Sequence, residues 1–400
     1  MELHARRQRR LVALVQVLAL SSWFSASAVG PSLQSALGIS LGAAVVLTSA
    51  VQAGFVIGAV SSATLNLADR VEAPRLMAVS ALGAAVCTAL VAVPGNGFTV
   101  VVLLRLLTGV SLAGVYPVGL KVMASWSTTR ERGRAFGMLV GALTLGSAMP
   151  QLIRGIEGLA WQGVLLAAAS LTLVGAALAR TALRTGPHTL ARSRDLSPRY
   201  ALTMFRERGP RAANLGYFGH MWELYALWAW LPAFILASQA ANGSSTGGVV
   251  NVVAFASIGL AGVTGCLLGG WSSDRFGRVR TAVAALSVSG ACCLLSPLFF
   301  GAPVPVLTIF LLVWGAAVIA DSGVFSTALS ESADPRYVGT ALTAQTAIGF
   351  LLTIVTIHLV PVLAAGVGWR YAFLLLAVGP MLGVAAMSRY RAPAVAGAAS

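Results

Sequence analysis

Two carboxylic acids lie deep inside long apolar runs of this sequence. Glu223 falls within the run 212–238, and Asp321 falls within the run 304–328. An ionised carboxylate is costly to hold at the centre of a bilayer, so acids in such positions usually serve a function. A carboxyl group that gains and loses a proton as its surroundings change could couple a proton gradient to another process. Both acids are therefore candidates for proton coupling, with a static hydrogen-bonded group as the alternative.

Two basic side chains also lie within apolar runs. His220 precedes Glu223 by three residues, so a helix would place the two on one face. His220 could share a proton, bind a solute or form a static pair with the acid. Arg105 lies inside the run 98–122, where an arginine is costly unless it is paired or hydrated. Two interpretations of Arg105 stay open: a part in proton coupling, or hydrogen bonds to loops near the end of its span.

The segment from Tyr217 to Trp230 is unusually aromatic. Rings at this depth can stack on a planar or cationic solute, and the alternative is an aromatic belt combined with core packing. Trp228 and Trp230 lie nearer the end of the run and suit such a belt. The candidates for solute contact are Tyr217, Trp222 and Tyr225, together with the weaker candidates Trp23, Gln151 and Gln345.

The elements that must position these side chains are membrane-spanning helices. Hydrophobic residues make up 57% of the chain and charged residues only 10%, against about 25% charged residues in soluble domains. A transmembrane helix needs about 20 apolar residues, and the runs are too long and too uniformly apolar for barrel strands. We expect twelve spans and no sizeable soluble domain, with the spans at approximately 11–31, 41–66, 75–95, 98–122, 134–154, 161–182, 212–238, 249–271, 280–301, 304–328, 338–364 and 369–389.

Basic residues are concentrated in the connectors on one side of the predicted spans. Only Arg154 and Arg370 fall in connectors on the other side. The positive-inside rule explains this asymmetry and the net charge of +15 better than nucleic-acid binding does, and it predicts that both termini are cytoplasmic. Lys121 is the single lysine among 27 basic residues, which is typical of a GC-rich bacterial genome. We expect an integral protein of the bacterial cytoplasmic (inner) membrane.

The two ends of the chain carry similar landmarks. An Asp-Arg pair follows the second run at Asp69 and the eighth run at Asp274, while Trp161 opens the sixth run and Trp369 the twelfth. These pairs are separated by 205 and 208 residues, which indicates duplication of a six-helix unit. The predicted organisation is an N-terminal six-helix half at 1–182, a basic cytoplasmic linker at 183–211 and a C-terminal six-helix half at 212–400.

The strongest motif lies between the eighth and ninth runs. It reads Gly-x-x-x-Asp-Arg-x-Gly-Arg-x-Arg, and its residues are Gly270, Asp274, Arg275, Gly277, Arg278 and Arg280. Here the chain resembles the major facilitator superfamily, which has this pattern in the connectors after its second and eighth helices. The resemblance implies a gate that holds the two halves together on the cytoplasmic side, whereas the alternative is a tight turn with positive-inside charge. The first-half copy keeps Asp69 and Arg70 but lacks the Gly-Arg pair, which weakens it as a latch.

Three further patterns bear on the resemblance. Arg105-Leu-Leu-Thr-Gly109 resembles the superfamily's fourth-helix pattern, whose arginine is linked to proton coupling in many members. The fifth run lacks the Gly-Pro pair of the family's antiporters, so antiport is not supported. Gly-x-x-x-Gly spacings at 54/58, 137/141 and 265/269 predict close helix packing.

The resemblance implies an all-α polytopic membrane protein with two pseudo-symmetric six-helix halves and secondary active transport by alternating access. We expect a small organic or drug-like solute and protons as partners, and a monomer in the lipid bilayer. No nucleotide-binding loop or metal-ligand spacing is present, so we expect no cofactor and no metal. The alternatives are a transporter of small anions, a sensor or scaffold that has lost transport, and a membrane enzyme built on His220 and Glu223. Uniporters, symporters and antiporters share the matching motifs.

Overall fold

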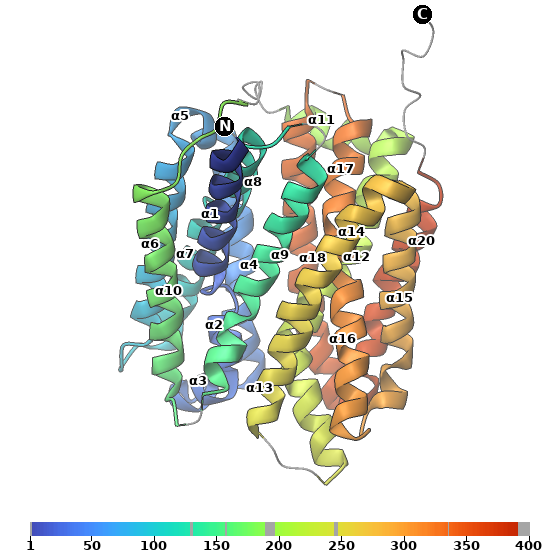
Figure 1. Ribbon diagram of the computed structural model, residues 1–400. Helices are drawn as coiled ribbons and strands as arrows, with labels where there is room; N and C mark the ends of the chain where they lie inside the picture. The colour runs from blue at the N-terminus through green and yellow to red at the C-terminus, as the bar shows by residue number, and fades with distance from the viewer. Residues whose placement is uncertain are drawn as a thin grey trace, which may run out of the picture.

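The computed structural model describes residues 2–128, 131–156, 158–188, 197–243, 247–334 and 336–390, without the side chains of Asp69, Arg132, Pro198 and Gly247. Every regular element in these ranges is helical. The helices stand in two bundles, with the first half of the chain in one and the second half in the other (Figure 1). The predicted all-α fold of two helical halves is therefore confirmed, while the boundaries proposed for the halves and the linker stay predictions.

Helices of the first half carry the chain repeatedly between the two ends of the molecule. They are α1 (Glu2–Leu20), α2 (Ser25–Ala28), α3 (Gly30–Leu37), α4 (Leu41–Thr64), α5 (Leu67–Arg70), α6 (Ala73–Val91), α7 (Phe98–Leu112), α8 (Tyr116–Ser125), α9 (Arg132–Arg154) and α10 (Trp161–Thr181).

The second half follows two short helices of the connecting segment, α11 (Pro198–Thr203) and η1 (Met204–Arg206). Its helices are α12 (Arg208–Ala241), α13 (Gly247–Phe255), the π-helical η2 (Ala256–Ala261), α14 (Gly262–Phe276), α15 (Arg278–Phe299), α16 (Val304–Ala320), α17 (Ser322–Ser332), α18 (Val338–Val367), α19 (Trp369–Ala372), η3 (Phe373–Ala377) and α20 (Val378–Met387).

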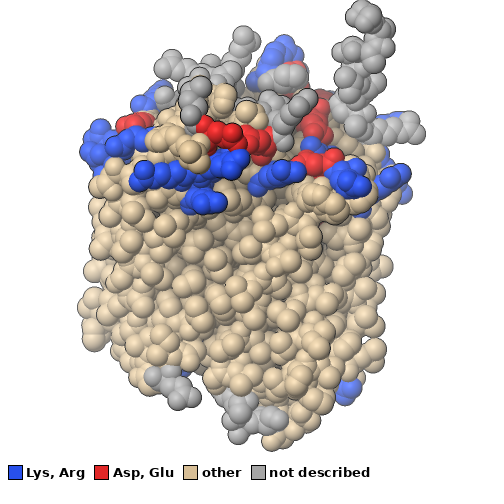
Figure 2. Space-filling model, in the orientation of Figure 1, with Lys and Arg blue, Asp and Glu red and all other residues tan. Residues whose placement is uncertain are grey.

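Charged side chains gather at one end of the molecule, called the basic end below. Figure 2 shows them as a band at that end, above a long wall with almost no charged side chain on the visible face. Arg154 closes α9 and Arg370 lies in α19, toward the opposite end. The charges are therefore divided as the connectors predicted, and the apolar wall suits a surface that faces lipid.

Eleven stretches of helix in the described ranges are long and apolar enough to cross a membrane. Several of them join consecutive helices, such as Phe98–Ser125 (α7 and α8) and Val304–Ser332 (α16 and α17). The one predicted span that is not among these eleven is the first, 11–31, in the N-terminal segment. There α1 begins at the basic end, and α2 and α3 continue to the opposite end (Figure 1). The chain thus makes twelve passes, of which the first is broken.

Three of the spans are interrupted part-way along. The first is broken between Leu20 and Ser25, and another ends α7 at Leu112 and restarts as α8, where the ring of Pro117 removes a backbone donor. The third break is at Asp321, which ends α16 and begins α17. Each break frees backbone oxygens that need donors in an apolar environment.

Glycines allow the closest helix contacts at equivalent places in the two halves. A Cβ on Gly54 of α4 would overlap the backbone of Leu106 in α7, and a Cβ on Gly265 of α14 would overlap that of Ala316 in α16. The close packing predicted at 54/58 and 265/269 is confirmed. Its recurrence between the second and fourth spans of each half agrees with duplication.

Candidate functional site

The break in the tenth span turns Asp321 toward α12. His220 Nδ1 lies 2.8 Å from Asp321 Oδ1, and each side chain is 1% exposed. Neither Asp321 Oδ1 nor His220 Nε2 has an aligned hydrogen-bond partner among the described residues, so the contact is close without being a directed hydrogen bond. The sequence placed His220 on one face of α12 with Glu223, but the structure brings its ring to Asp321.

Glu223 contacts a separate set of side chains. Its Oε1 accepts hydrogen bonds from Trp314 Nε1 at 2.6 Å and from Cys293 Sγ at 3.3 Å. Both donors belong to the second half, Cys293 in α15 and Trp314 in α16. Sequence reasoning missed these partners, although a tryptophan in the middle of a span signals a need for an acceptor. Glu223 is therefore enclosed within one bundle.

The Asp321–His220 pair lies nearer the boundary between the halves. Cys266 of α14 and Ala320, the residue before Asp321, line one pocket with Val140 of α9, and Cys266 Sγ lies 3.7 Å from Thr144 Oγ1 of α9 in the first half. The ring of Tyr217 lies 6.1 Å from that of His220, between centroids. A movement of one half against the other would therefore change the surroundings of this pair more than those of Glu223.

Arg105 of α7 is fully buried in the first half. Its guanidinium donates to the backbone oxygens of Ser22 at 3.2 Å and Trp23 at 2.6 Å, and to Ser25 Oγ at 3.2 Å. The break after α1 frees these oxygens, and they lie at the negative end of the α1 dipole. No ion pair joins Arg105 to an acid in the described part of the chain. Its contacts are those of the second interpretation, hydrogen bonds to a non-helical segment.

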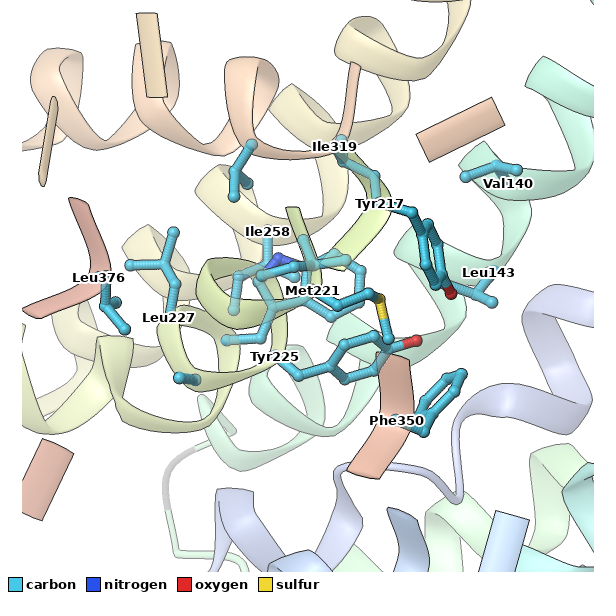
Figure 3. Close-up of a cluster of buried hydrophobic side chains, with 14 of the residues drawn as sticks. Val140, Leu143, Tyr217, Met221, Tyr225, Leu227, Ile258, Ile319, Phe350 and Leu376 are labelled. Carbon is cyan, nitrogen blue, oxygen red and sulfur yellow. The ribbon is translucent and has the colours of Figure 1, made fainter. Parts of the chain in front are cut away.

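Six aromatic rings, called the central aromatic cluster below, meet across the boundary between the halves. They are Trp23, Phe24 and Phe55 of the first half and Tyr225, Trp228 and Phe350 of the second. The centroid of Trp23 lies 5.9 Å from that of Tyr225 and 5.6 Å from that of Phe350, and Phe55 lies 4.5 Å from Phe350. Figure 3 shows Tyr225 and Phe350 next to each other. The cluster contains two of the predicted solute contacts, Trp23 and Tyr225.

Two other predicted solute contacts point in different directions. Tyr217 is buried, and Figure 3 shows its ring beside Leu143 of α9, at the boundary. Trp222 faces the interior of the second half, where its Nε1 donates to the Leu375 oxygen at 3.1 Å. Tyr217 therefore stays near the cluster, whereas Trp222 is not brought to it.

The predicted amides are buried, and the cluster has members that the sequence did not reveal. Gln151 and Gln345 are 3% and 1% exposed, and each has one amide atom without a partner in the described ranges. The assignment of Trp228 to an interfacial belt is wrong, because its ring is 2% exposed within the cluster. Sequence reasoning also missed Phe24, Phe55, Phe350 and the neighbouring Gln52. A phenylalanine or glutamine within an apolar run does not reveal whether its side chain faces the other half of the molecule.

The motif between α14 and α15 approaches the first half at the basic end. Asp274 Oδ1 accepts from Arg278 Nη1 at 3.1 Å, and Arg278 Nη2 lies 3.2 Å from Glu331 Oε1 of α17. A Cβ on Gly133, in the first turn of α9, would lie 2.6 Å from Asp274 Oδ2. The carboxylate is thus at the positive end of a helix from the other half. Gly277 makes the turn with φ +90°.

The remaining motif residues have lesser contacts. Gly270 lies close to α9, where an added Cβ would be 3.9 Å from Gly137 Cα. Arg275 is exposed over the ring of Trp271, 5.9 Å from its centroid, and Arg280 is exposed.

In the first-half copy of the motif, Arg70 is exposed at the end of α5, and the side chain of Asp69 lies outside the described part.

Known proteins resemble this chain over most of its length. The sequence pattern of the Major Facilitator Superfamily matches residues 12–356. The gallate transporter of Pseudomonas putida is 25% identical over 325 residues, covering 72% of this chain and 70% of that protein. The probable L-galactonate transporter of Escherichia coli is 27% identical over 225 residues, but the match spans only about half of each protein, 52% and 48%.

One further relative and one solved structure are also transporters. The probable sulfoacetate transporter SauU of Cupriavidus necator is 23% identical and covers 59% of each protein. The solved structure of the proton:xylose symporter XylE superposes with a TM-score of 0.74 over 96% of this chain and 95% of that one, at 16% identity. These relatives are named as transporters and not as enzymes, which sets aside the membrane-enzyme alternative. The pattern match and the fold together place this chain in the major facilitator superfamily of membrane transporters.

Proposed function

We propose that this chain is a secondary active transporter of small organic acid anions. The observation that carries the proposal is Arg105, a fully buried cation with no acidic partner in the described ranges. A desolvated positive charge favours an anionic ligand over a neutral or cationic one. L-Galactonate, gallate and sulfoacetate, which appear in the names of the three relatives, are all organic acid anions. Of the solute classes left open by the sequence, the anion is the better supported.

Two sets of contacts between the halves, one near the basic end and one along the boundary, support transport by alternating access. Near the basic end, Asp274 and Gly270 approach α9. Along the boundary, rings such as Phe55 and Phe350 pack on one another. Opening toward either side requires one set of contacts to separate while the other holds, which is the rocking motion of this fold.

Proton coupling is assigned to Asp321 with His220 ahead of Glu223. A coupling group must exchange its proton with each side in turn, so it should lie where the halves move apart. Ala320 and Gly323, on either side of Asp321, line one pocket with Val140 of the first half, and Cys266 Sγ lies 3.7 Å from Thr144 Oγ1. Glu223 is enclosed by two donors of its own half. A proton entering with the solute would also offset the charge of the anion.

The membrane orientation completes the proposal. The basic end faces the cytoplasm by the positive-inside rule, and the protein acts as a monomer in a bacterial inner membrane. The three curated relatives come from bacteria, which supports that location.

Flux into proteoliposomes tests the proposal. The purified protein is reconstituted with a pH-sensitive dye inside, and L-galactonate, gallate, sulfoacetate, neutral xylose and a lipophilic cation are added one at a time. We expect at least one acid to enter together with protons. Entry of xylose or the cation but of no acid would replace the anion with the drug-like solute of the alternative. No flux from correctly folded protein would favour the scaffold.

A further inference from the structure

The amide of Gln52, in α4, has a donor that no described residue satisfies. Its side chain has no exposed surface, and its Oε1 accepts from Trp23 Nε1 at 3.0 Å. An indole N–H can only donate, so this bond fixes which end of the amide faces Trp23. Nε2 is then the free end, and it has no partner among the described residues. A buried N–H without an acceptor is costly, so the group calls for an acceptor that arrives with a ligand.

Two further donors around the central aromatic cluster also lack acceptors in the part of the chain that the structure describes. Trp228 Nε1 is one, on a ring 2% exposed, and Arg105 Nε is the other, on a side chain that is fully buried. Neither assignment depends on an amide orientation, because both groups can only donate. Trp228 belongs to the cluster, and Arg105 holds the backbone oxygen of Trp23. All three unsatisfied groups are donors, so the missing partner is rich in acceptors.

The rings of the central aromatic cluster favour a solute that is planar. Phe24 lies 5.9 Å from Tyr225 and 6.0 Å from Trp228, and Phe55 lies 4.5 Å from Phe350. These pairs join different halves, so rocking apart exposes ring faces to water on both sides of the boundary. A planar ring entering between them restores stacking contacts on both faces, whereas an open polyhydroxy chain does not.

We infer that the central aromatic cluster and Gln52 form a subsite for a planar aromatic carboxylate that carries ring hydroxyl groups. The ring packs between faces contributed by the two halves, and the carboxylate and hydroxyl oxygens supply acceptors for Gln52, Trp228 and Arg105. The inference rests on the proposed transport of organic acids and names the class within it. It favours aromatic acids over open-chain sugar acids and alkyl sulfonates.

Calorimetric binding to the full-length protein in lipid nanodiscs tests the inference without requiring transport. The probes are gallate, a planar trihydroxybenzoate, and L-galactonate and sulfoacetate, which have no ring. We expect gallate to bind about tenfold more tightly than either, because only gallate has a ring that can stack on the ring faces of the two halves.

Two substitutions locate the effect. Gln52→Glu keeps an oxygen for Trp23 but replaces the free donor with a negative charge, and Phe350→Leu removes a ring face at the boundary. Phe350→Leu should weaken gallate binding by about tenfold and galactonate binding by less than about threefold, whereas the negative charge of Gln52→Glu should weaken the binding of both acids. Phe234→Leu is the matched control, because Phe234 is equally buried but stacks at 4.8 Å on Phe373 within the second half. It should change neither affinity.

The outcomes separate this inference from the function on which it rests. If gallate binds no more tightly than L-galactonate, or if Phe350→Leu weakens the two acids equally, the aromatic subsite is wrong. Flux of L-galactonate or sulfoacetate would still support organic acid transport in that case. If gallate binds with the expected dependence on Phe350 and Gln52 but no acid crosses the membrane, the subsite stands and the transport proposal fails.

Discussion

The two halves of the molecule share their packing and differ in their chemistry. The first half buries a cation, Arg105, which is held by neutral oxygens of a broken helix. The second half buries two acids, and one of them, Asp321, lies at a helix break of its own. The glycine contacts of Gly54 and Gly265 recur at equivalent places.

This difference indicates a division of labour after duplication. Backbone packing between the second and fourth spans of each half was retained, because a side chain there would overlap the facing helix. Charged groups inside the bundles were free to diverge, and the gate motif diverged with them. We propose that the first half holds the anion and that the second half carries the proton. The rings of the two halves then pack on the solute between them.

The largest expected effect comes from removing the proton site of the second half. Asp321→Asn keeps the size of the side chain but cannot ionise, so gradient-driven accumulation should fall about a hundredfold, the lower end of the range for loss of a positioned proton-transfer group. Exchange of labelled for unlabelled solute, which needs no gradient, should remain. Both are measured in the same proteoliposomes.

Glu223→Gln is the comparison for that experiment. It should alter stability through the contacts with Trp314 and Cys293 and leave most of the proton-driven accumulation. If Glu223→Gln abolishes accumulation and Asp321→Asn does not, the proton site belongs to the enclosed acid. Normal accumulation in both variants would remove proton coupling from the second half altogether.

The next effect concerns the buried cation of the first half. Arg105→Met should abolish measurable anion binding and lower stability, at roughly 1–3 kcal/mol for each buried oxygen left without a donor. The oxygens left without a donor are those of Trp23 and Ser25 Oγ, because Ser22 O still accepts from Ser25 Oγ at 2.9 Å. Arg105→Lys keeps the charge with fewer donors and should retain part of the binding. If wild type and Arg105→Met are both folded and bind the anion with equal affinity, the proposal that the first half binds the anion is wrong.

The fold was largely predictable from the sequence because its causes are local. Length and apolarity predict twelve helical passes, the one-sided arginines predict an orientation, and the Asp-Arg pairs at Asp69 and Asp274 indicated the duplication. The broken first span was not foreseen, because Ser21 to Phe24 continue an apolar run without a proline. Its structure depends on Arg105, which is distant in sequence and satisfies the freed oxygens.

The site was predictable in its residue types but not in its pairings. The three-residue spacing of His220 and Glu223 describes a single helix, whereas the contact with Asp321 depends on how α12 packs against the break in another helix. Trp228 was assigned to a membrane belt from its position along one run. Only the arrangement of the two halves reveals that its ring lies against Phe24 and Tyr225.

A smaller effect should distinguish the two copies of the gate motif. Asp274→Asn removes a charge from the start of α9 and from Arg278, and should shift the balance between open and closed states at the basic end by about 0.5–2 kcal/mol. Arg70→Ala, in the degenerate copy, should have a weaker effect because that side chain is exposed. Labelling of a cysteine introduced at Gly137 reports the opening. A stronger response to Arg70→Ala would show that the first-half copy is the working gate.

The smallest effect concerns the ion pairs at the basic end of each half. Arg9 Nη1 lies 3.1 Å from Glu131 Oε2, and this hydrogen-bonded guanidinium lowers the pKa of Glu131 below its ordinary value. The contribution to stability is therefore full above the ordinary pKa of a glutamate and is lost as the pH falls through the lowered pKa. Both side chains are partly solvated, so Glu131→Gln should cost less than about 1 kcal/mol at neutral pH.

Thermal unfolding at neutral and at acidic pH checks this sign. The difference between wild type and Glu131→Gln should be present at neutral pH and should disappear once the wild-type carboxyl is protonated. Glu331→Gln gives the counterpart in the second half, where Arg278 also contacts Asp274 and retains a partner after the change. Its loss should therefore be the smaller of the two. An equal loss for Glu131→Gln at both pH values would mean that packing, and not the ion pair, joins α1 to the start of α9.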